Sequence, residues 1–419
     1  MRKRLIYRAI ASSLVLFSAQ AAAVPFGSVD PRSMAMGGVG VASGTSANAG
    51  FLNPALLAAA KYEEDFSLEL PIIYARVSDP DKLIDEIDNY QNDDLEGKLT
   101  ASIDAYIATP TNQNAAQVGA DAEALLNQLL RLTNKTLEGE FAGGFVVGIP
   151  SKKFGASLTI GARAVGGGVL NVTDEDQAKI QQIIDDALDG TAQLFQNDDV
   201  QDQIAGNDIV DKLTSNLQAR GAILAEVGLS LAREFNVGGH DVAIGITPKL
   251  VKVTTFDYRL DVNTAEFNAD EGQKEYSNIN FDLGLAKDYN NGWKVGFSVK
   301  NLISQEYKTV LGHTVAIDPQ ARVGISHATE WVTVAVDADL NSAEPVSYGS
   351  ATQYVGIGAE LDIWDTVQLR VGYRHNLKDS DTSVPTVGIG FSPFGVHIDL
   401  AAAANDNETA VSGQLGFRF

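Results

Sequence analysis

The chain lacks cysteine, and it contains only five histidines among its 419 residues. The absence of cysteine excludes disulfides, thiol chemistry and thiolate metal sites. The histidines, at positions 240, 313, 327, 375 and 397, do not pair at the spacing of metal ligands, so each is expected to be solvated or to line a pore. We therefore predict no bound metal and no cofactor.

Positive charge is also scarce, with 31 Lys and Arg against 54 Asp and Glu and a net charge of -23. Such acidity argues against nucleic acid as a partner, because phosphate binding needs a basic surface. The exception is the start of the chain, where four basic residues precede an apolar stretch over 9–17 and small residues over 19–23. This layout predicts a secretory signal peptide over residues 1–23, cleaved near Ala23, and hence an exported protein.

Long apolar runs are missing after the signal peptide. No later segment offers the eighteen or so uninterrupted apolar residues that a membrane helix needs. The exported chain is therefore either soluble or crosses a membrane as a closed barrel, because only helices and closed barrels satisfy the backbone inside lipid.

The second half of the chain alternates between apolar and polar residues. Trp293, Val295, Phe297 and Val299 share one face of a strand, with small and polar residues between them. Extending this period-two pattern predicts about fourteen strands, at 66–77, 141–150, 154–167, 222–235, 240–256, 276–289, 292–303, 318–328, 330–340, 352–363, 366–376, 384–392, 395–404 and 410–419.

The links between these strands alternate between short turns and longer loops. That asymmetry is typical of an all-β transmembrane barrel of antiparallel strands, with its turns on the periplasmic side and its loops outside. A soluble sandwich also alternates, but strands of ten or more residues, glycine-rich inward faces and the end of the chain favour the barrel. The last strand places Phe417 and Phe419 on one face, which we interpret as the insertion signal that the outer-membrane assembly machinery reads.

Two of the longer links, at 78–140 and 171–221, carry apolar residues at helical spacing. Both are predicted as acidic, amphipathic helical insertions on the extracellular side. Ile180, Ile183 and Ile184 form part of one apolar stripe, which Ile209, Val210, Leu213 and Leu217 extend. The stripes are interpreted as packing surfaces for one another in a cap over the external mouth, with a hydrophobic binding groove as the alternative.

Glycines are concentrated between residues 34 and 57, at first sight like a phosphate-binding loop. The pattern Gly38-x-Gly40-x-x-x-Gly44 has one residue too many before its third glycine, and no strand precedes it, which argues against a dinucleotide site. The segment ends in Asn53-Pro54-Ala55, where Asn-Pro favours a turn.

A signal peptide, a glycine-rich segment ending in Asn53-Pro54-Ala55, about fourteen strands and a terminal Phe419 together resemble the FadL family. These are outer-membrane channels for long-chain fatty acids and other hydrophobic molecules. The resemblance implies that the N-terminal segment folds inside the barrel as a plug or hatch. Glycine suits such a segment, because side chains would collide in a crowded lumen.

A closer resemblance is to a TraF-like family of conjugal transfer proteins related to those barrels. It rests on "MGGVGVAS", "FLNPALLA", "EDFSLELP" and "DPDKLIDEIDNYQ". The label is shared with a thioredoxin-like transfer protein, but that redox meaning cannot apply to a chain without cysteine. The acidic insertions also depart from the apolar entrance that a fatty-acid channel needs.

These patterns divide the chain into a signal peptide at 1–23, a plug at 24–61 and a barrel at 62–419. The residues expected to identify the plug are Gly37, Gly38, Gly40, Asn53, Pro54 and Ala55. The charges expected to face the lumen are Glu226, Asp282, Lys294, Lys300, Asp337, Asp339, Glu360, Arg370, Arg374, Asp399 and Arg418. They could pair across a wet interior, hold the hatch or line a permeation path.

The sequence thus favours a non-enzymatic protein of a Gram-negative outer membrane, because it has no local nucleophile motif. The leading hypothesis is a passive channel for small hydrophobic molecules, gated by the N-terminal hatch, with membrane lipid and a hydrophobic ligand as partners. The alternative is a structural or surface-interaction protein that is associated with conjugal transfer and transports nothing. An exported soluble sandwich is a third reading.

We expect the full-length chain to sediment with the outer membrane after cell fractionation. Unheated samples should migrate differently from boiled ones in a denaturing gel, because a closed barrel resists detergent until heat unfolds it. Recovery in the soluble fraction, without a heat-dependent shift, would contradict the barrel.

Overall fold

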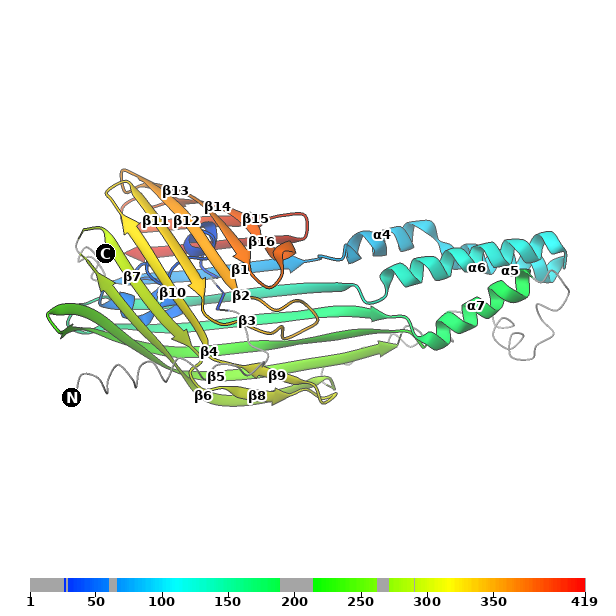
Figure 1. Cartoon of the computed structure of the whole chain (residues 1–419), viewed down its shortest axis with the longest axis horizontal. Helices are drawn as coiled ribbons and strands as arrows, with labels where there is room; N and C mark the ends of the chain where they lie inside the picture. Colours follow the sequence, from blue (N-terminus) through cyan, green and yellow to red (C-terminus); the bar gives the residue numbers. More distant parts are fainter. Residues whose placement is uncertain are drawn as a thin grey trace, which may run out of the picture.

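The computed structural model describes residues 26–27, 29–59, 66–188, 214–261, 271–289 and 291–418. Within them, fourteen antiparallel strands form a closed barrel (Figure 1). This confirms the predicted fold class and strand number. The strands are β1 (Ser67–Ser78), β2 (Thr136–Ile149), β3 (Gly155–Asn171), β4 (Asn216–Val237), β5 (His240–Asp261), β6 (Gln273–Asp288), β7 (Trp293–Lys300), β10 (Gln320–Ala328), β11 (Val332–Asp339), β12 (Tyr354–Ile363), β13 (Val367–Asn376), β14 (Val384–Phe391), β15 (Val396–Ala404) and β16 (Glu408–Arg418).

The barrel has one end with tight turns and one with longer loops, here called the turn end and the loop end. Neighbours in the ring follow chain order, and β1 pairs with β16 to close it. The turn between β4 and β5 uses Gly238 and Gly239, both at positive φ, where glycine avoids the strain of a side chain. β1 begins and β16 ends at the turn end, so the chain enters and leaves the barrel on the same side.

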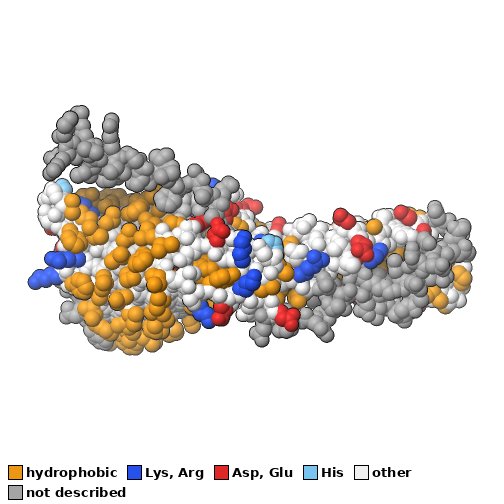
Figure 2. Space-filling model, turned by 90° about the horizontal axis from the view of Figure 1, so that it is seen from below, with side chains coloured by type: hydrophobic (Ala, Val, Ile, Leu, Met, Phe, Trp, Pro, Cys, Tyr) orange, Lys and Arg blue, Asp and Glu red, His pale blue; other side chains and the backbone are white. Residues whose placement is uncertain are grey.

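The outer face of the barrel is apolar. Leu229, Ile246 and Leu250 belong to a large set of exposed apolar side chains, which Figure 2 shows as a band over the barrel. At the turn end, Trp364 and Phe394 are 79% and 100% exposed, as in the aromatic girdles at membrane interfaces. Among the described residues, no helix is both long enough and apolar enough to span a membrane.

Strands β2 to β6 reach further toward the loop end than the sequence predicted. β2 begins within the insertion expected at 78–140, and β4 begins within the one expected at 171–221. Leu217 therefore lies in a strand rather than on a helix. Alternation missed the start of β6 because Gln273, Lys274 and Glu275 are all polar. Glu275 forms an exposed ion pair with Lys252 on β5 at 2.9 Å.

In the described part of the chain, four helices form an arm beyond the loop end: α4 (Leu83–Asp93), α5 (Leu95–Ala108), α6 (Asn112–Leu132) and α7 (Asp174–Leu188). Leu99, Val118, Leu125 and Ile180 are buried in a cluster that α5, α6 and α7 share, so the apolar stripes do pack against one another. The arm extends along the long axis of the molecule instead of folding across the barrel opening, so the predicted cap is wrong (Figure 1). Ile209, Val210 and Leu213 lie outside the described residues.

A short hairpin, which the sequence did not predict, lies between β7 and β10. Its strands are β8 (Gln305–Lys308) and β9 (Thr314–Ile317). Tyr307, Val315 and Ile317 pack against Val251 and Val253 on the lumen side of β5. The hairpin therefore fills part of the lumen, and its four-residue strands are too short to give a clear periodic signal.

Asp176 fastens α7 to the start of β4. Its carboxylate is fully buried and accepts hydrogen bonds from the backbone N–H groups of Thr214 and Ser215, at 2.8 and 2.7 Å, and from the Ser215 hydroxyl. Burial alone would raise the pKa of Asp176, but the hydrogen bonds from Ser215 and Thr214 outweigh it, so the pKa lies below its usual range.

We therefore expect Asp176→Asn to weaken the attachment of α7 by about 1 to 3 kcal/mol, because it impairs several buried hydrogen bonds. Because its pKa is lowered by folding, ionised Asp176 stabilises the wild type fully above its ordinary pKa, and this contribution is lost as the pH falls through the lowered value. Hydrogen exchange of α7 amides should show this pH dependence in the wild type and not in the variant. Asp185→Asn, an exposed change on the same helix, should leave α7 unchanged.

Candidate functional site

The N-terminal part of the described chain lies inside the barrel, toward the turn end (Figure 1). We call residues 26–27 and 29–59 the luminal segment. It contains α2 (Pro31–Ala35), α3 (Ala49–Leu52) and the 3-10 helix η1 (Pro54–Leu57). Its core side chains are almost fully buried, with Met36, Val41 and Leu57 at 0% exposure. The segment therefore supplies the interior that the barrel wall packs against.

Glycines on the wall make room for the backbone of the luminal segment. A Cβ at Gly296 would overlap the carbonyl oxygen of Val41. A Cβ at Gly245 would lie 2.5 Å from both the carbonyl carbon of Pro54 and the nitrogen of Ala55. The same holds elsewhere on the ring, where Gly356, Gly358 and Gly372 face Met36 and Gly37. The inner face is therefore glycine-rich because two backbones approach each other without room for side chains.

The Asn53-Pro54-Ala55 motif joins two parts of the luminal segment to the wall. The Asn53 amide nitrogen donates to the carbonyl oxygens of Val41, at 2.8 Å, and of Leu285 on β6, at 3.1 Å. Its side-chain oxygen accepts from the N–H of Ala55 at 3.1 Å, which caps η1, and Pro54 occupies the first position of that helix. Asn53 and Ala55 are both fully buried. One side chain thus fixes the turn, the earlier glycine-rich stretch and a wall strand.

A buried chain of charges links the luminal segment to the opposite part of the wall. Arg32 forms a two-point contact with Glu360 on β12, at 2.7 and 2.9 Å. Glu360 also accepts from Arg370 on β13 at 2.6 Å, and Arg370 reaches Asp399 on β15 at 2.5 Å. Bidentate arginine-carboxylate geometry is among the strongest ways to satisfy buried charges.

Asp337 binds the luminal segment through backbone groups. Its carboxylate accepts from the N–H of Gly40 at 2.8 Å and from that of Val41 at 2.9 Å. Beside it, Arg322 donates to the carbonyl oxygen of Gly38 at 2.9 Å and to Asp339 at 2.6 Å. The glycine-rich stretch is therefore held by wall charges, and Gly37 and Gly38 adopt positive φ values of 74° and 82° there.

The remaining charges from the sequence-based set also lie on the inner face. Lys294 donates to the carbonyl oxygen of Ala59 at 3.1 Å, and Lys300 donates to that of Phe26 at 3.2 Å. The others pair with wall residues: Asp282 and Glu226 with Lys249, Arg374 with Glu408, and Arg418 with Glu69. Phe417 lies on the outward face of β16, and Phe419 lies outside the described residues.

Several charged residues of this network were not predicted. Arg32 lies in the luminal segment, where no strand alternation marks an inward position. Lys249 and Arg322 lie on strands, and extending the alternation through β5 and β10 could have found both. Glu69 lies beside an irregularity in the pairing of β1, so its inward side chain is hard to infer; it bonds His397 at 2.5 Å.

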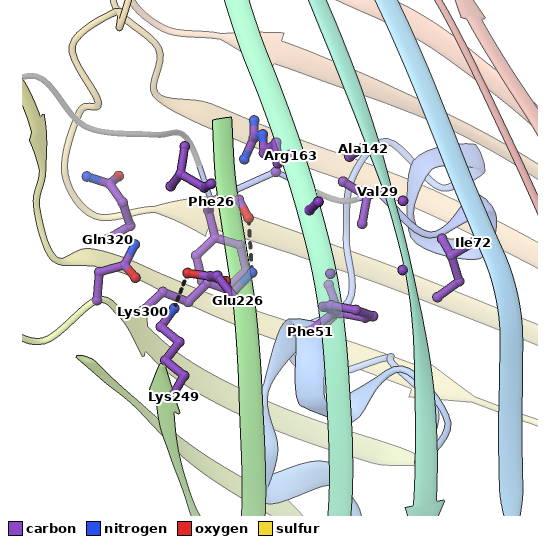
Figure 3. A pocket seen from close by; sticks show the side chains of 18 residues that line it. Phe26, Val29, Phe51, Ile72, Ala142, Arg163, Glu226, Lys249, Lys300 and Gln320 are labelled. Carbon is purple, nitrogen blue, oxygen red and sulfur yellow. Dashed lines mark hydrogen bonds and ion pairs between the residues drawn. The ribbon is translucent and has the colours of Figure 1, made fainter. Parts of the chain in front are cut away.

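A cavity of about 100 Å³ lies between the luminal segment and strands β1 to β5 (Figure 3). Phe26, Phe51, Leu52, Ile72 and Leu224 give it apolar walls. The charged residues that line it are Arg163, Glu226, Lys249 and Lys300.

A second cavity of about 40 Å³ lies nearer the turn end, lined by Gly50, Thr247 and Gly228. The two cavities share Phe51, Glu226, Lys249 and Lys300. Phe51 on α3 therefore borders both cavities. Across the described part of the chain, no three His, Asp or Glu residues are grouped so that they could hold a metal ion.

The family model described as "F plasmid transfer operon, TraF, protein" matches residues 50–339, from α3 to the end of β11. A comparison with curated proteins gives no match. Among solved structures, the chain is similar to the Ralstonia pickettii toluene transporter TbuX, with 14% identity over 93% of this chain and 97% of that chain and a TM-score of 0.49. It is also similar to the Pseudomonas putida toluene transporter TodX, with 11% identity over 95% and 98% and a TM-score of 0.45.

We expect Gly296→Ala to displace the luminal segment, because the new methyl group would overlap the carbonyl oxygen of Val41. Overpacking of this kind typically costs about 1 to 3 kcal/mol. The temperature at which the folded band disappears from a gel should fall, and protease should cut the luminal segment faster. Gly139→Ala is the matched control, since a Cβ at Gly139 meets nothing within 4 Å. Equal behaviour of the two variants would contradict the role of close backbone approach.

Proposed function

The chain belongs to the family described as "F plasmid transfer operon, TraF, protein", and from its geometry we propose that it is an outer-membrane channel with an N-terminal plug. The closed barrel with its apolar outer face supports the location, because that surface suits lipid. The plug comprises residues 24–61, of which the luminal segment is the described part. The channel acts passively on small hydrophobic molecules.

The observation that carries this proposal is the pair of neighbouring cavities that Phe51 lines. They follow the same side of the luminal segment, along β3, β4 and β5, from the middle of the barrel toward the turn end. The apolar side chains of the larger cavity favour a small ligand with an apolar body. A ligand that moves from the larger to the smaller cavity has to pass Phe51, so displacement of α3 would open the route.

Association with conjugal transfer remains the second candidate function. The family description and the acidic helical arm, which has its own buried core, favour a surface that contacts another molecule. In that case the barrel is a scaffold, and its luminal segment serves stability alone.

A reversible tether tests whether the plug moves. In a Thr159→Ser background, which removes a crowding methyl group, we introduce Gly50→Cys and Ser157→Cys. The Ser157 hydroxyl oxygen lies 3.0 Å from a Cβ built at Gly50, which suits a disulfide between α3 and β3. The chain has no other cysteine.

Cells that carry the full chain should take up the hydrophobic dye N-phenylnaphthylamine faster than cells without it. The oxidised tether should abolish this gain, and a reductant should restore it. The control pair is Ser67→Cys with Gly148→Cys in the same background, which links the paired strands β1 and β2 and leaves the plug untethered. If the chain brings no gain in uptake, or if the tether leaves the gain intact, the gated channel is wrong and the scaffold is favoured.

A further inference from the structure

The loop between β11 and β12, residues 340–353, crosses the lumen. In the ring, β11 and β12 lie opposite β2 and β3. Nevertheless the crossing loop contacts that distant wall: the N–H of Gly349 donates to the Glu138 carboxylate on β2 at 3.0 Å, and the Ser347 hydroxyl donates to the same oxygen. Arg220 on β4 donates to the carbonyl oxygen of Ser347 at 2.9 Å.

Further contacts, within the crossing loop and to neighbouring elements, hold it in place. At its base, Ala343 and Thr352 exchange two backbone hydrogen bonds at 2.8 Å. Near its tip, the Tyr348 ring lies 4.6 Å from the Arg220 guanidinium, within cation-π distance. Val346 is 5% exposed and belongs to the apolar cluster of the β8–β9 hairpin. Crossing loop and hairpin therefore form one apolar layer.

This layer covers the larger cavity on the side of the loop end. Leu224 belongs both to the apolar layer and to the lining of the cavity. β4 runs from the loop end to the turn end, and along its inner face come Arg220, which bonds the loop, then Leu224, and then Glu226 in the cavity. The cavity thus has the crossing loop on one side and the luminal segment on the other.

We propose that the crossing loop is an outer gate, latched to the opposite wall by Glu138. The inference rests on the proposed channel function and gives it a second barrier, independent of the plug. The latch is local and polar: the Glu138 carboxylate accepts from two donors at the tip, and Arg220 donates to the Ser347 carbonyl oxygen beside it. A Cβ at Gly349 would overlap the Glu138 carboxylate, so a side chain there would displace the carboxylate from the loop tip.

Access to the cavity can be measured without any transport. Ala142 lines the cavity and is 2% exposed, and Ala142→Cys would be the only thiol in the chain. We add a membrane-impermeant maleimide to intact cells that carry this reporter. Glu138→Ala removes the latch from the wall, and Gly349→Ala displaces it from the side of the loop.

Both variants should raise the labelling rate on the order of tenfold or more, as expected from the loss of hydrogen bonds to a charged group. Glu140→Ala is the matched control: it lies on the same face of β2 and pairs with Arg163 and with Arg76, which also lies 3.7 Å from Glu138, but its own carboxylate does not bond the crossing loop. Its labelling rate should stay close to that of the reporter alone. Heat-dependent gel migration verifies that each variant is folded.

Unchanged labelling in folded Glu138→Ala and Gly349→Ala would overturn the outer gate, and so would an equal increase in Glu140→Ala. Because Gly349 lies in the loop and not in the wall, its variant keeps the test valid even if loss of Glu138 impairs folding. Failure of dye uptake in the tether experiment would refute transport without affecting labelling, so the two proposals can fail separately.

Discussion

Close approach of two backbones is the constraint on which the rest of this structure depends. The luminal segment lies against inner-face glycines on several strands, from Gly245 on β5 to Gly372 on β13. Such contacts leave no space for a side chain on the wall, and they place several peptide groups within hydrogen-bonding distance of wall side chains. Asp337 and Arg322 do so for the glycine-rich stretch. The position of the luminal segment, its hydrogen bonds and the residue types on the inner wall therefore depend on one another.

The electrostatics of the interior follow from that packing. Burying a charge in a barrel costs desolvation free energy unless the charge has a partner. Removing one member of such a pair therefore leaves the other buried without compensation. Here the partners connect different elements: Arg32 joins the luminal segment to β12, and Glu138 joins β2 to the crossing loop. The pairs thus determine which elements stay together. This distinguishes the lumen from a water-filled pore, where charges would face solvent.

Alternation along strands β7 to β16 was enough to predict the barrel, because each of these strands has one face toward an apolar exterior. It failed at the loop ends of β2 to β6, for example at the start of β6, where Gln273, Lys274 and Glu275 are all polar. The same alternation places charges such as Asp337 and Arg370 on the inner face. It could not reveal their partners, because Arg32 is outside any strand and the crossing loop meets Glu138 from the far side of the ring. The partner of each charge depends on tertiary contacts between residues that lie hundreds of positions apart in the sequence.

The arm is rooted close to the latch. Glu138 lies near the start of β2, the strand that follows α6, while Asp176 fastens α7 to Ser215, shortly before Arg220 on β4. Both wall residues that hold the crossing loop therefore lie at the base of the helices: Glu138 follows α6 after a few residues of chain, and Arg220 is linked to α7 through the hydrogen bonds between Asp176 and Ser215. The arm therefore meets these two strands at the rim of the barrel, so that rotation of the arm about the rim would move both strands. In the proposed outer gate, a pull on the helices would act first on the residues that latch the crossing loop.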